Sequence, residues 1–91
     1  MRIKKTARNF SRADFTDYNG VECSLQNSSL ATEDAIWLGC NEANPKQMTA
    51  NGWQPVRMPD DYIAHTRMHL TRKQVKKLLP HLEKFVKTGE I

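Results

Sequence analysis

The sequence predicts an α+β fold, with a small antiparallel sheet of about four strands and a kinked C-terminal helix packed on it. Three observations carry this prediction. Two alternating stretches flank the turn signal Asn19-Gly20, a short apolar run fills residues 35–40, and a helix-start signal at Thr71 opens a long amphipathic stretch.

The length of 91 residues gives room for one domain. We place this domain at residues 9–91, after a basic and flexible lead-in at residues 1–8. A chain this short buries only about two-thirds of its unfolded surface, so its core is modest. Self-association into a homo-oligomer is therefore expected.

The first two strands form a predicted hairpin around Asn19-Gly20, because both residues tolerate a positive φ. A two-residue loop would place Asp17 opposite Glu22, with two like charges facing each other. A three-residue loop instead brings apolar side chains to one face, in two pairs: Phe15 with Cys23, and Ala13 with Leu25. We predict the second register.

The middle of the chain is predicted to form one central strand and one edge strand. The nearly continuous apolar run at 35–40 is typical of a central strand. Residues 41–52 are expected to form a loop. Residues 53–58 follow as a strand, which Pro55 confines to an edge because proline has no N–H to donate.

Residues 62–70 alternate, so their side chains point to two faces. One set is apolar enough for a core: Tyr62, Ala64, Thr66, Met68 and Leu70. The other set contains a row of ring nitrogens and a guanidinium, from His65, Arg67 and His69, facing water or a cleft.

The helix is the best-specified element. Thr71 and Gln74 have capping-box spacing, and Gly89 is a natural stop. An apolar stripe about 120° wide runs along it: Val75, Leu78, Leu79, Leu82, Phe85 and Val86. Pro80 lies on the opposite side and is expected to kink the helix, because it removes one hydrogen bond.

The charge of +4 is segregated along the chain. Residues 1–8 carry four cations and no acids, residues 9–60 sum to −4, and residues 61–91 sum to +4. Such segregation favours anionic partners through the local field. Nucleic acid is one such partner, and a solvated basic surface is the plain alternative.

The anion-binding signals converge at the junction between the last strand and the helix. Arg72 lies in the first helical turn, where a cation is unfavourable against the helix dipole unless an anion is near. The free amides around Thr71 favour the same anion. We therefore expect these residues to bind a phosphorylated ligand, with Ser29 as a hydroxyl contact: Arg67, His69, Thr71, Arg72, His65 and Ser29.

Other chemistries have weak support. On a strand, His65 and His69 would lie about 13 Å apart, too far to share a metal ion. No nucleophile elbow or paired-carboxylate motif is present. We expect no catalytic residue, no metal and no cofactor, and therefore a protein that is not an enzyme.

Cys23 and Cys40 fit no zinc or redox spacing, so we expect two small buried thiols. No apolar run follows the basic N-terminus, and none approaches the roughly 18 residues of a membrane span. These features predict a cytoplasmic protein that has no membrane partner.

Three separated strings resemble one family in the same order: SSLATEDAIWLG at 28–39, TRMHLT at 66–71 and VKKLLPHLEKFVKTGEI at 75–91. They are similar to small proteins encoded by tailed phages and prophages, over most of the chain. Within that group the chain resembles the first Thoeris anti-defence family. The chain departs from this pattern in being short between Asn41 and Trp53, where ligand choice could differ.

The resemblance implies a binding protein that sequesters nucleotide-derived immune signals, cyclic ADP-ribose isomers and cyclic oligonucleotides, without degrading them. It also implies an antiparallel sheet with C-terminal helical segments and an oligomer with ligands between subunits. Two alternatives stay open from the sequence. One is a small basic regulator that binds nucleic acid, and the other is an inhibitor of a host enzyme through protein contact.

Overall fold

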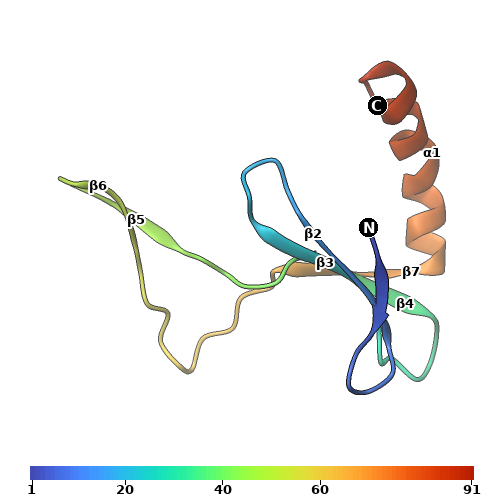
Figure 1. The fold of residues 1–91 in the computed structure, drawn as a ribbon, viewed down its shortest axis with the longest axis horizontal. Helices are drawn as coiled ribbons and strands as arrows, with labels where there is room; N and C mark the ends of the chain where they lie inside the picture. The colour runs from blue at the N-terminus through green and yellow to red at the C-terminus, as the bar shows by residue number, and fades with distance from the viewer.

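The computed structural model describes all of residues 1–91 and shows an α+β fold, as the sequence predicts (Figure 1). A five-stranded antiparallel sheet has the order β1-β2-β3-β4-β7, from Ile3–Lys5, Ser11–Thr16, Glu22–Asn27, Ala35–Cys40 and Arg67–Thr71. A separate two-stranded sheet joins β5 (Lys46–Thr49) to β6 (Gly52–Pro55), and one helix, α1, runs from Arg72 to Thr88.

The expected loose lead-in is wrong for its central residues. Strand β1 pairs with β2 and places Ile3 opposite Ala13. A tight turn makes the pairing possible, because Thr6 Oγ1 accepts a hydrogen bond from the Phe10 amide. Asn9 supplies the positive φ of 66° that closes this turn. Thus the sheet gains a fifth strand.

The predicted hairpin register is confirmed. Phe15 pairs with Cys23 and Ala13 with Leu25 across β2 and β3. In the turn, Asp17 Oδ1 accepts hydrogen bonds from the amides of Asn19 and Val21 at 2.8 and 2.9 Å. These two hydrogen bonds to one aspartate side chain stabilise the three-residue loop over the two-residue loop.

Strand β4 has the predicted bounds, but β7 is shorter than predicted. Only Arg67–Thr71 pairs with β4, and residues 62–66 have no regular structure. At the start of the pairing, Gly39 lies opposite Arg67, and a Cβ built on Gly39 would come within 2.5 Å of the Thr66 carbonyl oxygen. The close approach of β7 to β4 therefore depends on a glycine at this position.

Strand register divides the main sheet into two faces. What we call the apolar face carries Ala13, Phe15, Cys23, Leu25, Ile36, Leu38, Cys40, Met68 and Leu70. The polar face carries Arg12, Asp14, Ser24, Gln26, Trp37, Arg67 and His69. Both thiols lie on the apolar face without a disulfide; Cys23 is buried and Cys40 is half-buried.

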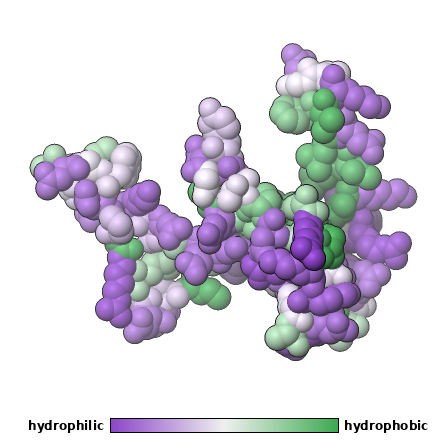
Figure 2. Space-filling view, in the orientation of Figure 1, coloured by the Kyte–Doolittle hydropathy of each residue, from purple (hydrophilic) through white to green (hydrophobic).

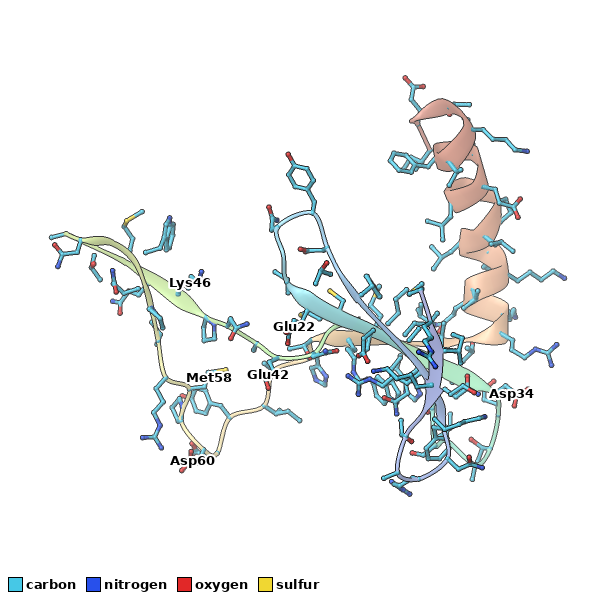
Figure 3. All side chains as sticks on the ribbon, in the orientation of Figure 1. Glu22, Asp34, Glu42, Lys46, Met58 and Asp60 are labelled. Carbon is cyan, nitrogen blue, oxygen red and sulfur yellow. The ribbon has the colours of Figure 1, made fainter.

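Residues 46–55 form an arm, the β5–β6 hairpin, where we expected a loop followed by a single strand. Its two-residue turn is Ala50-Asn51, and Gly52 opens β6, so the Asn-Gly dipeptide that marks the first hairpin recurs here. The Val56 amide donates to the Pro45 carbonyl oxygen at the base of the arm. Figure 3 shows Lys46 on the arm, and Met58 and Asp60 on the segment that follows it, away from the main sheet.

Helix α1 begins and ends as predicted, with a capping box at Thr71 and Gly89 as the C-terminal cap. It continues through Pro80 as a single element. The expectation that it packs along the sheet is wrong, because no residue of α1 is buried and its main contact with the sheet is with β7, the strand that it follows. Since Thr71 is both the last residue of β7 and the helix N-cap, no linker remains to turn the helix back over the sheet.

The helix therefore projects from the edge of the sheet (Figure 1), and its apolar stripe remains open to solvent (Figure 2). It is also neither long nor apolar enough to cross a membrane. Only Ala13, Cys23 and Ser24 are buried in the isolated chain.

Candidate functional site

The centre of the candidate site is a stacked pair of rings on the polar face. Trp37 and His69 are direct partners across β4 and β7. Their ring centroids lie 3.8 Å apart with an angle of 9° between the planes. His69 Nε2 lies 2.7 Å from Ser28 Oγ, at the end of β3, so the imidazole is held both by stacking and by a hydrogen bond.

Arg67 lies beside this stack without a carboxylate partner. Its Nη1 donates to Ser24 Oγ at 3.3 Å and to Gln26 Oε1 at 3.2 Å, two neutral groups on β3. Its Cζ is 5.6 Å from the centre of the Trp37 ring, within cation–π range. The guanidinium is therefore held in place while its charge remains uncompensated.

A hollow of about 320 Å³ opens next to Trp37, between the polar face and the turn after β1. It is lined by Thr6, Ala7, Arg8, Phe10, Arg12, Gln26, Ser29 and Trp37. Ser29 thus reaches the neighbourhood of Arg67 through the side chains of Gln26 and Trp37. Arg8 lies 5.6 Å from the centre of the Phe10 ring, and it adds a second cation with no acidic partner.

Arg12 is the one cation of this hollow that is paired. Its Nε lies 2.9 Å from Asp14 Oδ1. The hydrogen bond from Arg12 is the main reason that the pKa of Asp14 is lowered, and Lys4, 3.5 Å away, lowers it further, while partial desolvation opposes both. Arg12 also donates to Gln26 Oε1 at 3.4 Å, so the same amide oxygen is shared by Arg12 and Arg67.

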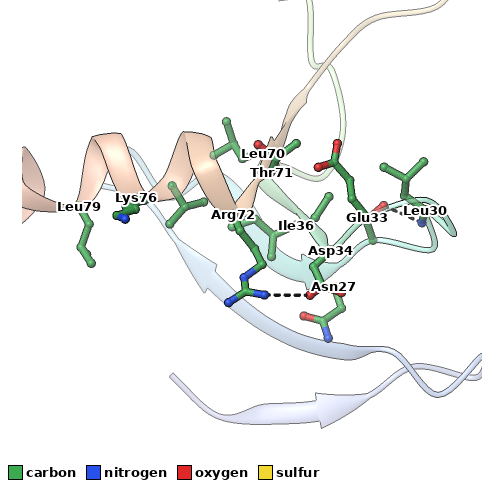
Figure 4. A pocket seen from close by; sticks show the side chains of 13 residues that line it. Asn27, Leu30, Glu33, Asp34, Ile36, Leu70, Thr71, Arg72, Lys76 and Leu79 are labelled. Atoms are coloured by element: carbon green, nitrogen blue, oxygen red, sulfur yellow. Dashed lines mark hydrogen bonds and ion pairs between the residues drawn. The ribbon is translucent and has the colours of Figure 1, made fainter.

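Thr71 and Arg72 lie in a different place from Arg67. They line a hollow of about 650 Å³ between the start of α1 and the ends of β3, β4 and β7 (Figure 4). Arg72 Nη1 lies 3.5 Å from Asp34 Oδ2, so an acid of the same chain offsets its position at the positive end of the helix.

The helix amides near Thr71 are also partly occupied. Thr71 Oγ1 accepts from the Gln74 amide at 3.3 Å, and Gln74 Oε1 accepts from the Thr71 amide at 2.9 Å. Glu33 lines the same hollow. This part of the structure therefore presents carboxylates and a closed cap, and it is a poor site for phosphate.

His65 is exposed and belongs to the irregular segment before β7. It therefore does not join the row with Arg67 and His69 that strict alternation predicted. Of the six candidate residues, the structure brings Arg67, His69 and Ser29 toward Trp37, while Thr71 and Arg72 share the second hollow.

Several residues of the site were not predicted from the sequence: Trp37, Ser24, Gln26, Ser28, Arg8 and Arg12. Trp37 lies inside an apolar run that is typical of a strand buried on both faces. Its neighbours on the same face, Ala35 and Gly39, have small side chains, and this was the available signal that one face of the strand is different. No sequence signal placed Ser24 and Gln26 beside Arg67.

No family model, curated protein or solved structure matches this chain. The chemistry of the site is therefore argued from its own atoms. No three His, Cys, Asp or Glu side chains gather closely enough to hold a metal ion. The arrangement offers an aromatic surface, an oriented guanidinium and hydroxyl groups, which together suit a flat, anionic ligand.

Proposed function

We propose that this protein binds a phosphorylated nucleotide ligand on the polar face and holds it without cleaving it. In the cell this would be the sequestration of a cyclic nucleotide or ADP-ribose-derived immune signal, by an anti-defence protein of the phage type that the sequence resembles. The observation that carries the proposal is Arg67, which is fixed by neutral partners beside the Trp37–His69 stack.

Arg67 supports the phosphate half of this proposal. Only its Nη1 is used within the chain, so Nη2 and Nε remain as donors. A guanidinium with two free donor groups can bind two phosphate oxygens at once, through charge-assisted hydrogen bonds about twice as strong as neutral ones. Because Ser24 and Gln26 already orient it, little side-chain entropy is lost when the ligand binds.

Trp37 and His69 support the base half. Stacking of a nucleobase on an aromatic side chain contributes about 1–3 kcal/mol. The hollow that Trp37 shares with Arg8 and Ser29 is open enough to admit a ring and its attached sugar phosphate. The imidazole of His69 is held by the stack and by Ser28 Oγ, and we expect the bound ligand to remain intact.

Isothermal titration against cyclic dinucleotides, cyclic trinucleotides and cyclic ADP-ribose isomers tests the proposal. We expect at least one member to bind, and Arg67→Gln and Trp37→Leu each to weaken it at least tenfold. Arg72→Gln is the matched control, since it removes an arginine from the other hollow. Ligand released by denaturing the complex should be chemically unchanged.

The proposal is wrong if no member binds at millimolar concentration, or if Arg72→Gln weakens binding as much as Arg67→Gln. Recovery of a cleaved ligand would contradict sequestration while leaving binding intact.

A second candidate is binding of single-stranded nucleic acid. An aromatic stack beside arginines on a sheet face is the kind of platform on which successive bases stack. The discriminating measurement is salt dependence. An oligonucleotide held by several phosphates loses affinity steeply between 50 and 200 mM salt, while a single small ligand does so weakly.

A further inference from the structure

We propose that α1 is an association helix, and that its apolar stripe is covered by a second copy of this chain. In this arrangement the α1 of each copy lies over the apolar face of its partner's sheet. The inference is independent of the ligand proposed above.

The first observation is the exposure of the stripe. Leu79 is 48% exposed and Leu82 and Phe85 are each 54% exposed, although these are the largest apolar side chains of the helix. Figure 2 shows the stripe as a continuous apolar band on the side of α1 that looks toward the β2–β3 hairpin across an open gap. A contiguous apolar surface of this kind is rare on a monomer and marks an interaction site.

The second observation is the excess surface of the isolated chain. A folded monomer of 10.5 kDa is expected to expose about 5,400 Å². This chain exposes 8081 Å², about 2,700 Å² more. Its radius of gyration is 16.3 Å, against about 12 Å for a compact domain of this length.

The excess has the size that an obligate partner needs. Permanent homodimers bury about 1,000–2,500 Å² on each subunit. Part of the excess surface belongs to the projecting β5–β6 arm. The apolar stripe of α1 and the apolar face of the sheet reach the range of a permanent homodimer if together they bury about 1,000 Å² on each subunit.

The third observation is that one chain carries two apolar surfaces that do not cover each other. The first turns of α1 reach the sheet at the hollow of about 650 Å³, which Val75 and Leu79 of the helix line together with Ile36 and Leu70 of the sheet (Figure 4). Beyond this point the helix leaves the sheet. A helix of 17 residues is about 25 Å long, and five strands span about 19 Å, so one α1 is long enough to cross a partner's sheet.

Charge selects the sheet of the partner over its helix. Residues 72–88 carry six cations and one acid, so two α1 helices lying side by side would repel each other. The residues of the apolar face are uncharged, because Asp14 and Glu22, the acids within the strands, lie on the polar face. A partner's helix laid on the apolar face therefore meets no such repulsion, and the exchange is reciprocal, as a two-fold symmetric dimer requires.

Light scattering on a sizing column tests the proposal with the full chain. The expected mass is twice 10.5 kDa. Leu82→Glu should shift the protein to the monomer mass, while Lys77→Glu, which introduces the same side chain on the opposite side of α1, should leave the dimer intact. A wild-type monomer at 100 µM, an assembly of other than two copies, or a Leu82→Glu dimer would overturn the proposal.

Two further readouts keep the test decisive if Leu82→Glu fails to fold. The melting temperature of the wild-type protein should rise with protein concentration, and a constant value over a hundredfold range would overturn the proposal. Alkylation of Cys40, which lies half-buried on the apolar face, should be faster in a folded Leu82→Glu monomer than in Lys77→Glu. Equal rates would contradict the placement of α1 over that face.

Discussion

Replacement of Gly39 by alanine tests how closely the candidate site depends on the β4–β7 pairing. Gly39 has a φ of 148°, a conformation that residues with a side chain rarely adopt. A Cβ at this position would lie 2.5 Å from the Thr66 carbonyl oxygen and 2.9 Å from the Arg67 Cα. Both are backbone atoms of the neighbouring chain segment, so no side-chain rotation can relieve the overlap.

The expected loss of stability has two parts. To restore an ordinary contact of 3.4 Å, the Thr66 oxygen must recede from 2.5 Å, by about 0.9 Å. A strained backbone conformation costs about 1–3 kcal/mol, and forcing an extra methyl group into a packed position costs about 1–3 kcal/mol more. Gly39→Ala should therefore lower the free energy of unfolding by about 2–6 kcal/mol.

Gly20→Ala is the matched control, because Gly20 also has a positive φ, of 81°, but open space around its Cβ position. Gly20→Ala should lower the free energy of unfolding only through the strained backbone conformation, by about 1–2 kcal/mol. Urea denaturation of the three proteins gives both differences. Since Gly39→Ala displaces Arg67, it should also weaken nucleotide binding, whereas Gly20→Ala should not. An equal loss of stability in both variants would refute the close approach of β7 to β4.

Three further predictions concern single contacts. The hydrogen bond from Arg12 lowers the pKa of Asp14. The Asp14 carboxylate should therefore stabilise the fold above its unfolded pKa near 3.8, and this stabilisation should be lost as pH falls through the folded pKa. The difference in free energy of unfolding between wild type and Asp14→Asn should shrink in acid. Burial raises the pKa of Cys23 above 9.0, with Asp17 and Cys40 adding to the effect, so the wild-type protein should lose stability relative to Cys23→Ala as pH rises beyond about 9. Thr71→Ala should lower the free energy of unfolding by about 1 kcal/mol through loss of the capping box, and unchanged helix content and stability would show that the cap is not formed.

Local signals gave the parts of the fold that depend on neighbours in the chain. The hairpin register followed from the positions of Asn19-Gly20 and of the like charges Asp17 and Glu22, and both limits of α1 followed from its caps. The arm was missed although Asn51-Gly52 carries the same turn signal, because the residues before the turn lack a clear alternation and were interpreted as a loop, which left residues 53–58 as a single edge strand.

The candidate site was only half predictable. Arg67 and His69 were chosen because alternate positions of a strand share a face, which is a property of the local backbone. Their partners Trp37, Ser24 and Gln26 come from strands that lie about 30 to 45 residues earlier, and nothing in the sequence states which strands become neighbours. The separation of Arg72 from Arg67 was invisible for the same reason, since it depends on Asp34 reaching the helix start.

The sequence by itself determined the strands of the first hairpin, the central strand and the helix with its apolar stripe. Each of these depends on residues that lie only a few positions apart in the chain. Only the tertiary structure decided that β7 lies beside β4, that Trp37 stacks on His69, and that α1 leaves the sheet instead of covering it. The physical reason is that strand order and helix direction are set by contacts between distant segments, whose free energies no local pattern encodes.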